Sequence, residues 1–124
     1  MTAPPEKLQL MLYEGAMRFA GQAKERILEK RYDQSCDLLL RAQDIMLELM
    51  CGLRHDLNGD LCGKMKAIYS FIYRKLVDAN VNRDTAAIDD AVKVLTIQRD
   101  IWLELMDKLA RERAAEPSGA GISA

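Results

Sequence analysis

The hydrophobic residues of this chain recur at three- and four-residue spacings from about residue 6 to about residue 113. That period is typical of amphipathic helices, and no useful length of the chain alternates with the period of two that strands show. The pattern predicts helices over residues 6–30, 33–54, 60–80 and 85–113. Short polar connectors favour antiparallel neighbours, so the predicted fold class is all-α, an up-down four-helix bundle.

The same spacing predicts which side chains point inward on each helix. The expected core residues are Leu8, Leu12, Ala16, Phe19, Ala23 and Ile27 on the first helix, Cys36, Leu39, Ala42, Met46, Leu49 and Leu53 on the second, Ile68, Ile72, Leu76 and Ala79 on the third, and Ile88, Ala91, Leu95, Trp102 and Leu109 on the fourth. Asp33 is expected to cap the second helix, and Asp84 or Thr85 the fourth. Gly15 is expected where a neighbouring backbone comes close.

The last two predicted helices carry more apolar surface than a bundle core requires. On the third helix Tyr69, Tyr73 and Val77 form a second stripe beside the core face, and on the fourth the second stripe is Val94, Ile97 and Ile101. A single stripe is enough to hold a helix in a bundle. The surplus therefore predicts a protein that binds a helix from another chain.

Length and composition narrow the class of protein. The chain has 124 residues, 49% of them hydrophobic, which is enough for the core of one domain. We expect a bundle domain over residues 1–113 and a disordered tail over residues 114–124, where Gly, Ser and Ala replace the periodic pattern. No apolar run approaches the roughly 20 residues of a membrane span, and the start of the chain lacks a signal peptide. A cytosolic protein without membrane insertion is therefore expected.

Charge and reactive side chains argue against several functions. A net charge of -1 gives no basic surface for nucleic acid. Three cysteines without a C-x-x-C pair suggest core residues and neither a disulfide framework nor a metal site. The single histidine, His55, lies in the 55–60 connector, where Asn58-Gly59 predicts a turn. No catalytic set or cofactor motif is present, so we expect no enzyme.

Separated segments of the chain resemble one known family, in the same order along the sequence. They are Thr2-Ala-Pro with Leu8 and Met11-Leu-Tyr-Glu-Gly-Ala-Met-Arg-Phe19, then Arg41-Ala-Gln-Asp-Ile45 with Glu48-Leu49, then Tyr69, Tyr73, Leu76 and Ala79-Asn80, and finally Val92, Leu95, Arg99 and Trp102. Over about residues 2–109 the chain is similar to the flagellin-specific export chaperones, the FliS family.

The resemblance implies a cytosolic four-helix bundle that binds the disordered C-terminal segment of flagellin, prevents its premature polymerisation and delivers it to the flagellar export apparatus. A client that folds on binding would occupy external apolar grooves. The resemblance and the second stripe on the fourth helix together give the expected peptide-binding residues: Tyr69, Ile72, Tyr73, Leu76, Ala79, Asn80, Val94, Ile97 and Ile101.

Two other functions fit part of the pattern. A glycine follows His55 at the spacing found in histidine phosphotransfer domains, although Asn58 stands where those domains have a basic residue. The surplus stripes would also suit a self-associating helical adaptor, and they allow a homodimer in the free state. Under the phosphotransfer hypothesis His55→Gln abolishes function, whereas the chaperone hypothesis predicts almost no effect.

Overall fold

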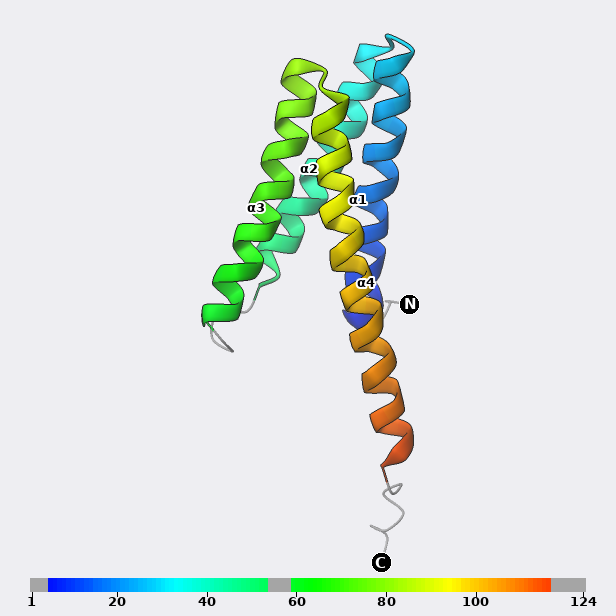
Figure 1. Ribbon diagram of the computed structural model, residues 1–124, viewed down its shortest axis with the longest axis vertical. Helices are drawn as coiled ribbons and strands as arrows, with labels where there is room; N and C mark the ends of the chain where they lie inside the picture. Colours follow the sequence, from blue (N-terminus) through cyan, green and yellow to red (C-terminus); the bar gives the residue numbers. More distant parts are fainter. Residues whose placement is uncertain (1–4, 54–58, 117–124) are drawn as a thin grey trace, which may run out of the picture.

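The computed structural model describes residues 5–53 and 59–116, and within these ranges every regular element is a helix. The helices are α1 (Pro5–Leu28), α2 (Tyr32–Cys51), α3 (Gly59–Asn82) and α4 (Thr85–Ala115). Successive helices run in opposite directions, and α4 also packs against α1, which closes the bundle (Figure 1). The predicted all-α four-helix bundle is confirmed. The C-terminal turns of α4 extend beyond the other helices (Figure 1).

The core of α1 lies on a slightly different face from the predicted one. Ala16, Ala23 and Ile27 are buried as expected, but Tyr13 and Ala20 complete the buried face, while Leu12 and Phe19 are half-buried and Leu8 is 45% exposed. Apolar side chains occupy both neighbouring arcs of α1, so spacing alone could not choose between them. Contact with α2 on one side and α4 on the other selects the arc with the small alanines.

Similar shifts occur on the other three helices. On α3, Tyr69 is buried, whereas the predicted core residue Ile68 is half-buried. On α2 the buried residue is Ser35 and not Cys36, and the Ser35 hydroxyl donates to the Tyr32 carbonyl oxygen at 3.0 Å, which satisfies its polar group. Of the cysteines expected in the core, only Cys62 is buried, and Cys51 is exposed. On α4 the predicted seam is buried from Ile88 to Leu95, whereas Trp102 and Leu109 are half-buried.

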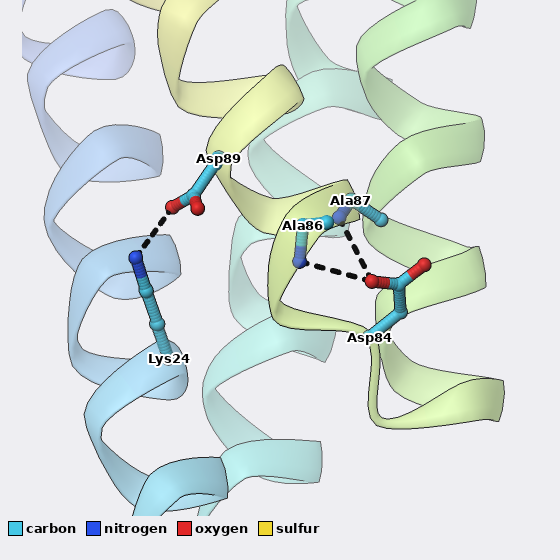
Figure 2. Close-up of polar contacts among 5 residues, drawn as sticks. All are labelled: Lys24, Asp84, Ala86, Ala87 and Asp89. Atoms are coloured by element: carbon cyan, nitrogen blue, oxygen red, sulfur yellow. Dashed lines mark hydrogen bonds and ion pairs between the residues drawn. The ribbon is translucent and has the colours of Figure 1, made fainter.

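The turn into α4 has the cap that the sequence predicts. The Asp84 carboxylate accepts hydrogen bonds from the backbone amides of Ala86 and Ala87, at 2.9 and 3.2 Å (Figure 2). These bonds satisfy two amide groups that a helix start leaves without partners. The prediction for α2 was wrong, because α2 begins at Tyr32 and its N-cap residue Arg31 makes no side-chain cap bond. Asp33 lies in the first turn, where its charge favours the helix dipole.

The first turns of α4 are tied to both neighbouring helices by ion pairs. Lys24 Nζ lies 2.7 Å from Asp89 Oδ1, which joins α1 to α4 (Figure 2). Lys75 Nζ lies 3.4 Å from Asp90 Oδ2, which joins α3 to α4. The two consecutive aspartates therefore mark the two flanks of α4, one toward α1 and the other toward α3.

Gly15 is buried between α1 and α2, but a side chain and not a backbone approaches it. A Cβ atom at this position would lie 3.2 Å from Ile45 Cδ1. The expectation of a close backbone was therefore wrong, since the gap is filled by the end of the Ile45 side chain. Gly21 has no atom within 4 Å of such a Cβ and is exposed.

We expect Gly21→Ala to raise the free energy of unfolding by about 0.5–1 kcal/mol, because alanine restricts the unfolded chain and favours helix at an open position. Urea unfolding followed by helical circular dichroism measures this. Gly15→Ala is the matched control, and its gain should be smaller because Ile45 must move. An equal gain at both positions would contradict the close contact at Gly15.

Two sequence predictions fall on parts of the chain that the structure does not describe. Residues 54–58 include His55 and most of the predicted turn, and Gly59 already belongs to α3. Residues 117–124 make up most of the predicted tail, while Ala114 and Ala115 are helical.

Candidate functional site

A row of exposed apolar side chains runs along the second half of α4. Val94 is half-buried, Ile97 is 48% exposed, Ile101 is 54% exposed, and Leu105 is 41% exposed. Their spacings of three and four residues place them on one face of the helix. We call these four residues the α4 stripe. The spacing of the first three also points to Leu105, which the sequence analysis did not include.

The ion pairs show which way the α4 stripe faces. Asp90 pairs with Lys75 of α3, and Val94 follows Asp90 by four residues, so the stripe continues the flank of α4 that faces α3. On α3, the half-buried Ile68 and Phe71 precede Lys75 at helical spacing, and Lys75 Nζ lies 5.6 Å from the centre of the Phe71 ring. The flank of α3 that faces the start of the stripe therefore carries the apolar side chains of Ile68 and Phe71 beside Lys75.

The structure separates the nine expected peptide-binding residues into a buried group and an accessible group. Tyr69, Ile72, Leu76 and Ala79 are 0% exposed and belong to the core. Their assignment to a surface groove is corrected, because side chains packed between four helices cannot touch a client in this structure. The five with accessible surface are Tyr73, Asn80, Val94, Ile97 and Ile101.

These accessible residues lie on opposite sides of α3. Ser70 Oγ donates to Met50 Sδ of α2 at 3.7 Å, and Tyr73 follows Ser70 by one helical turn, so Tyr73 lies on the flank that faces α2. The α4 stripe lies beyond the other flank. On the described helices the two sets therefore form separate surfaces.

The α2-facing side of α3 carries a smaller apolar surface. On α2, Leu40 and Leu47 are 48% and 43% exposed, and both lie on the same flank as Met50. On α3, Tyr73 and Val77 are half-buried. We call Leu40, Leu47, Tyr73 and Val77 the α2–α3 seam. Leu40 and Leu47 were not among the residues expected from the sequence to bind a peptide, because only the last two helices showed a second apolar stripe.

Behind these surfaces a buried polar cluster links α1 to α3. The hydroxyl oxygens of Tyr13 and Tyr69 are 2.6 Å apart, and Gln9 Nε2 donates to them at 2.9 and 3.0 Å. Burial, followed by the hydrogen bond with Tyr13, raises the pKa of Tyr69 well above its usual range, so this hydroxyl stays neutral. A neutral phenol that is fully packed and hydrogen-bonded is suited to support the fold and not to catalysis.

The C-terminal half of α4 is bonded to the first turn of α1 through Glu6. Trp102 Nε1 donates to the Glu6 carbonyl oxygen at 2.8 Å, and Arg113 lies 3.3 Å from the Glu6 carboxylate. The backbone amide of Glu6 and then Arg113 lower the pKa of that carboxyl. Beside this contact is an open hollow of about 300 Å³ between Lys7 and Met106. Trp102 therefore anchors α4 and leaves the stripe free on another face.

Within residues 5–53 and 59–116, no cluster of three or more His, Cys, Asp or Glu side chains could hold a metal ion. None of the described helices is long and apolar enough to cross a membrane. The accessible surfaces are apolar, and they can bury apolar side chains of a partner.

Comparison with known proteins decides the family. The family model described as "Flagellar protein FliS" matches residues 1–109. The chain belongs to the FliS family. The flagellar secretion chaperone FliS of Bacillus subtilis (strain 168) is 32% identical over 112 residues, which cover 90% of this chain and 83% of that protein. The flagellar secretion chaperone FliS of Salmonella typhimurium is 25% identical over 109 residues, covering 87% and 81%.

A solved structure supports the fold of this FliS-family chain. The crystal structure of a flagellar chaperone from bacteria superposes with a TM-score of 0.79 at 24% sequence identity, and the match covers 87% of this chain and 88% of that one. Likeness at this identity shows the fold alone. The resemblance to flagellar secretion chaperones read from the sequence is confirmed by the family match, and a FliS chaperone is expected to work with a partner from flagellar export.

Proposed function

We propose that this FliS-family chain is a cytosolic chaperone that binds the C-terminal segment of flagellin, keeps it from polymerising and delivers it to the flagellar export apparatus. The observation that carries the proposal is the α4 stripe. Three of its four side chains, those of Ile97, Ile101 and Leu105, are 41–54% exposed, and none of the three belongs to the buried core of the bundle. An exposed apolar row of this kind marks a binding surface.

The stripe fits an amphipathic helix from a client. Val94, Ile97 and Ile101 follow one another at the spacing with which a partner helix would place its own apolar residues. Ile68 and Phe71 lie on the flank of α3 that faces the start of this stripe. The α2–α3 seam, with Asn80 nearby, offers a second and smaller contact. A segment that is unstructured before binding can reach both sides of α3 because it folds as it binds.

The test is binding of a synthetic peptide of the flagellin C-terminal segment, measured by calorimetry. Ile101→Asp should weaken binding by at least about tenfold, since it places a charge in an apolar contact at a cost above about 1.4 kcal/mol. Tyr73→Asp should weaken it less, because the α2–α3 seam is smaller. Both variants should keep most of their stability, since neither side chain is fully buried.

Met11→Asp is the matched control. Met11 is 52% exposed, close to the 54% of Ile101, but it lies on α1. This variant should bind the peptide like the wild type. If all three variants bind normally, or if Met11→Asp weakens binding as much as Ile101→Asp does, the proposed surface is wrong.

A further inference from the structure

A second open hollow lies between the start of α1 and the end of α2. Its volume is about 260 Å³. That is several times the volume of one water molecule, about 30 Å³, but it is below the range of sites for whole small molecules, about 300–1,000 Å³. The space therefore suits one long side chain of a partner. We call it the α1–α2 hollow; Leu8, Leu12 and Leu49 line it with apolar surface, and Gln9 and Glu48 line it with polar groups.

The apolar side of the hollow is accessible. Leu8 is 45% exposed and Leu12 is half-buried, whereas Leu49 belongs to the core and closes the hollow from behind. Met11 follows Leu8 by three residues, so it lies beside Leu8 on α1, and it is 52% exposed. A partner can therefore bury a hydrocarbon chain inside the hollow and a neighbouring apolar residue at its edge.

The two polar side chains of the hollow both offer oxygen atoms to a ligand. Gln9 Nε2 donates to the hydroxyls of Tyr13 and Tyr69, which fixes the orientation of the amide. None of the described residues donates to Gln9 Oε1, and every fully buried polar side-chain atom in these residues has a hydrogen bond, so Oε1 is accessible. Glu48 forms no ion pair with any described residue. The hollow thus accepts hydrogen bonds and carries negative charge.

The charges beside the hollow also favour a cation. Asp44 precedes Glu48 by one helical turn, and within the described residues it has no ion pair either. Farther along this flank of α2, the charge of Arg41 is paired with Asp37 at 3.3 Å. On α1, Lys7 lines the other hollow, between α1 and α4. Among the described residues, the two carboxylates therefore have no compensating cation.

We propose that the α1–α2 hollow is a docking site for a second protein partner, which inserts an arginine side chain next to an apolar residue of its own. The planar guanidinium has five N–H donors, so it can donate to the Glu48 carboxylate and to Gln9 Oε1, while its methylene groups pack against Leu8 and Leu12. A lysine ammonium is more strongly hydrated and fits this site less well. The apolar neighbour covers Leu8 and Met11.

This partner and the flagellin client would bind at the same time. The hollow lies between α1 and α2, whereas the α4 stripe continues the flank of α4 that faces α3. The inference does not rest on the proposed function, because the stripe contributes no residue to the hollow.

The test uses the tripeptide acetyl-Leu-Arg-Leu-amide, titrated into the isotope-labelled protein and followed by the NMR shifts of the backbone amides. The signals of Leu8, Leu12 and Gly52 should move, and that of Ile101 should not. The same peptide with citrulline keeps the size of arginine without its charge. It should bind at least about fivefold more weakly, which corresponds to the upper range for an accessible charge pair. A lysine peptide should also bind more weakly than the arginine peptide.

Glu48→Gln removes the charge from the protein instead. It should weaken binding of the arginine peptide by a similar factor and leave binding of the citrulline peptide unchanged, because both changes remove the same interaction. Asp78→Asn is the matched control, since Asp78 is also an exposed carboxylate without an ion pair among the described residues, but it lies on α3. Absent shifts, equal binding of the arginine peptide and either other peptide, or normal binding by Glu48→Gln would each overturn the proposal.

Further arms test other occupants and separate this inference from the proposed function. Ile101→Asp should leave binding of the arginine peptide unchanged. If the flagellin C-terminal peptide displaces it, the hollow belongs to the client surface, the second partner is overturned and the proposed function stands. If the arginine peptide binds only after deletion of residues 1–4, or ever more weakly as protein concentration rises, this chain itself fills the hollow and the proposal is overturned. If the arginine peptide binds as expected but flagellin does not bind, only the proposed function fails.

Discussion

Leu95→Ala should lower the free energy of unfolding by about 2–5 kcal/mol, the usual cost of removing a large buried side chain from a packed core. Leu95 is fully buried, and it lies among the core residues of all four helices. It is also the last fully buried residue of α4, and beyond it the helix packs through half-buried side chains such as Trp102. Urea unfolding followed by circular dichroism measures the effect.

Val94→Ala is the control for that prediction. Val94 is the neighbouring residue, but it is half-buried at the edge of the core and begins the α4 stripe. Its truncation removes less apolar surface from contact and should therefore cost clearly less. Equal destabilisation by the two variants would mean that the core and the stripe have been assigned to the wrong faces of α4.

Tyr69→Ala should lower the free energy of unfolding by about 3–5 kcal/mol, the usual cost of truncating a large aromatic side chain in a core to alanine. The Tyr69 ring is 0% exposed, and it packs 6.3 Å from the ring of Tyr13. Truncation also removes the hydroxyl that bonds Tyr13 and Gln9. The same urea experiment measures the loss. A cost below about 1 kcal/mol would indicate that Tyr69 is a surface residue, as the sequence analysis proposed.

Tyr69→Phe keeps the ring and isolates the role of the hydroxyl. The pKa of Tyr69 is raised in the folded protein, while in the unfolded chain it has the ordinary value of about 10. Above about pH 10 the unfolded chain therefore loses this proton while the folded protein keeps it, so stability falls as pH rises. The variant lacks this titration, and its stability should fall less steeply than that of the wild type. Equal slopes would contradict a neutral buried hydroxyl.

The sequence could predict much of the fold because helical periodicity is a local property. Spacing alone located the four helices within a few residues and placed Leu39, Ala42, Ile88 and Ala91 in the core, where the structure has them. The Asp84 cap was also predictable, since a cap depends on the residues next to it. Resemblance to a family supplied the chaperone function, which no single motif of the chain carries.

The candidate site was only partly predictable because it depends on which helix lies beside which. The spacing around Val94 identified the α4 stripe, but the same kind of spacing wrongly put Tyr69 on the surface. The chain has two adjacent apolar arcs on α3, and only packing against the other helices decides which is buried. The hydroxyl groups of Tyr13 and Tyr69, which share a hydrogen bond, come from residues 56 positions apart.

What the sequence by itself determined about this protein is therefore its helical content, its approximate helix ends and the excess of apolar surface on its last two helices. These follow from interactions between residues three or four positions apart. Only the tertiary structure decided that Tyr73 and Ile101 lie on opposite sides of α3, and that Trp102 anchors α4 to Glu6. The physical reason is that burial is settled by packing between helices distant in sequence, and one amphipathic pattern fits more than one such arrangement.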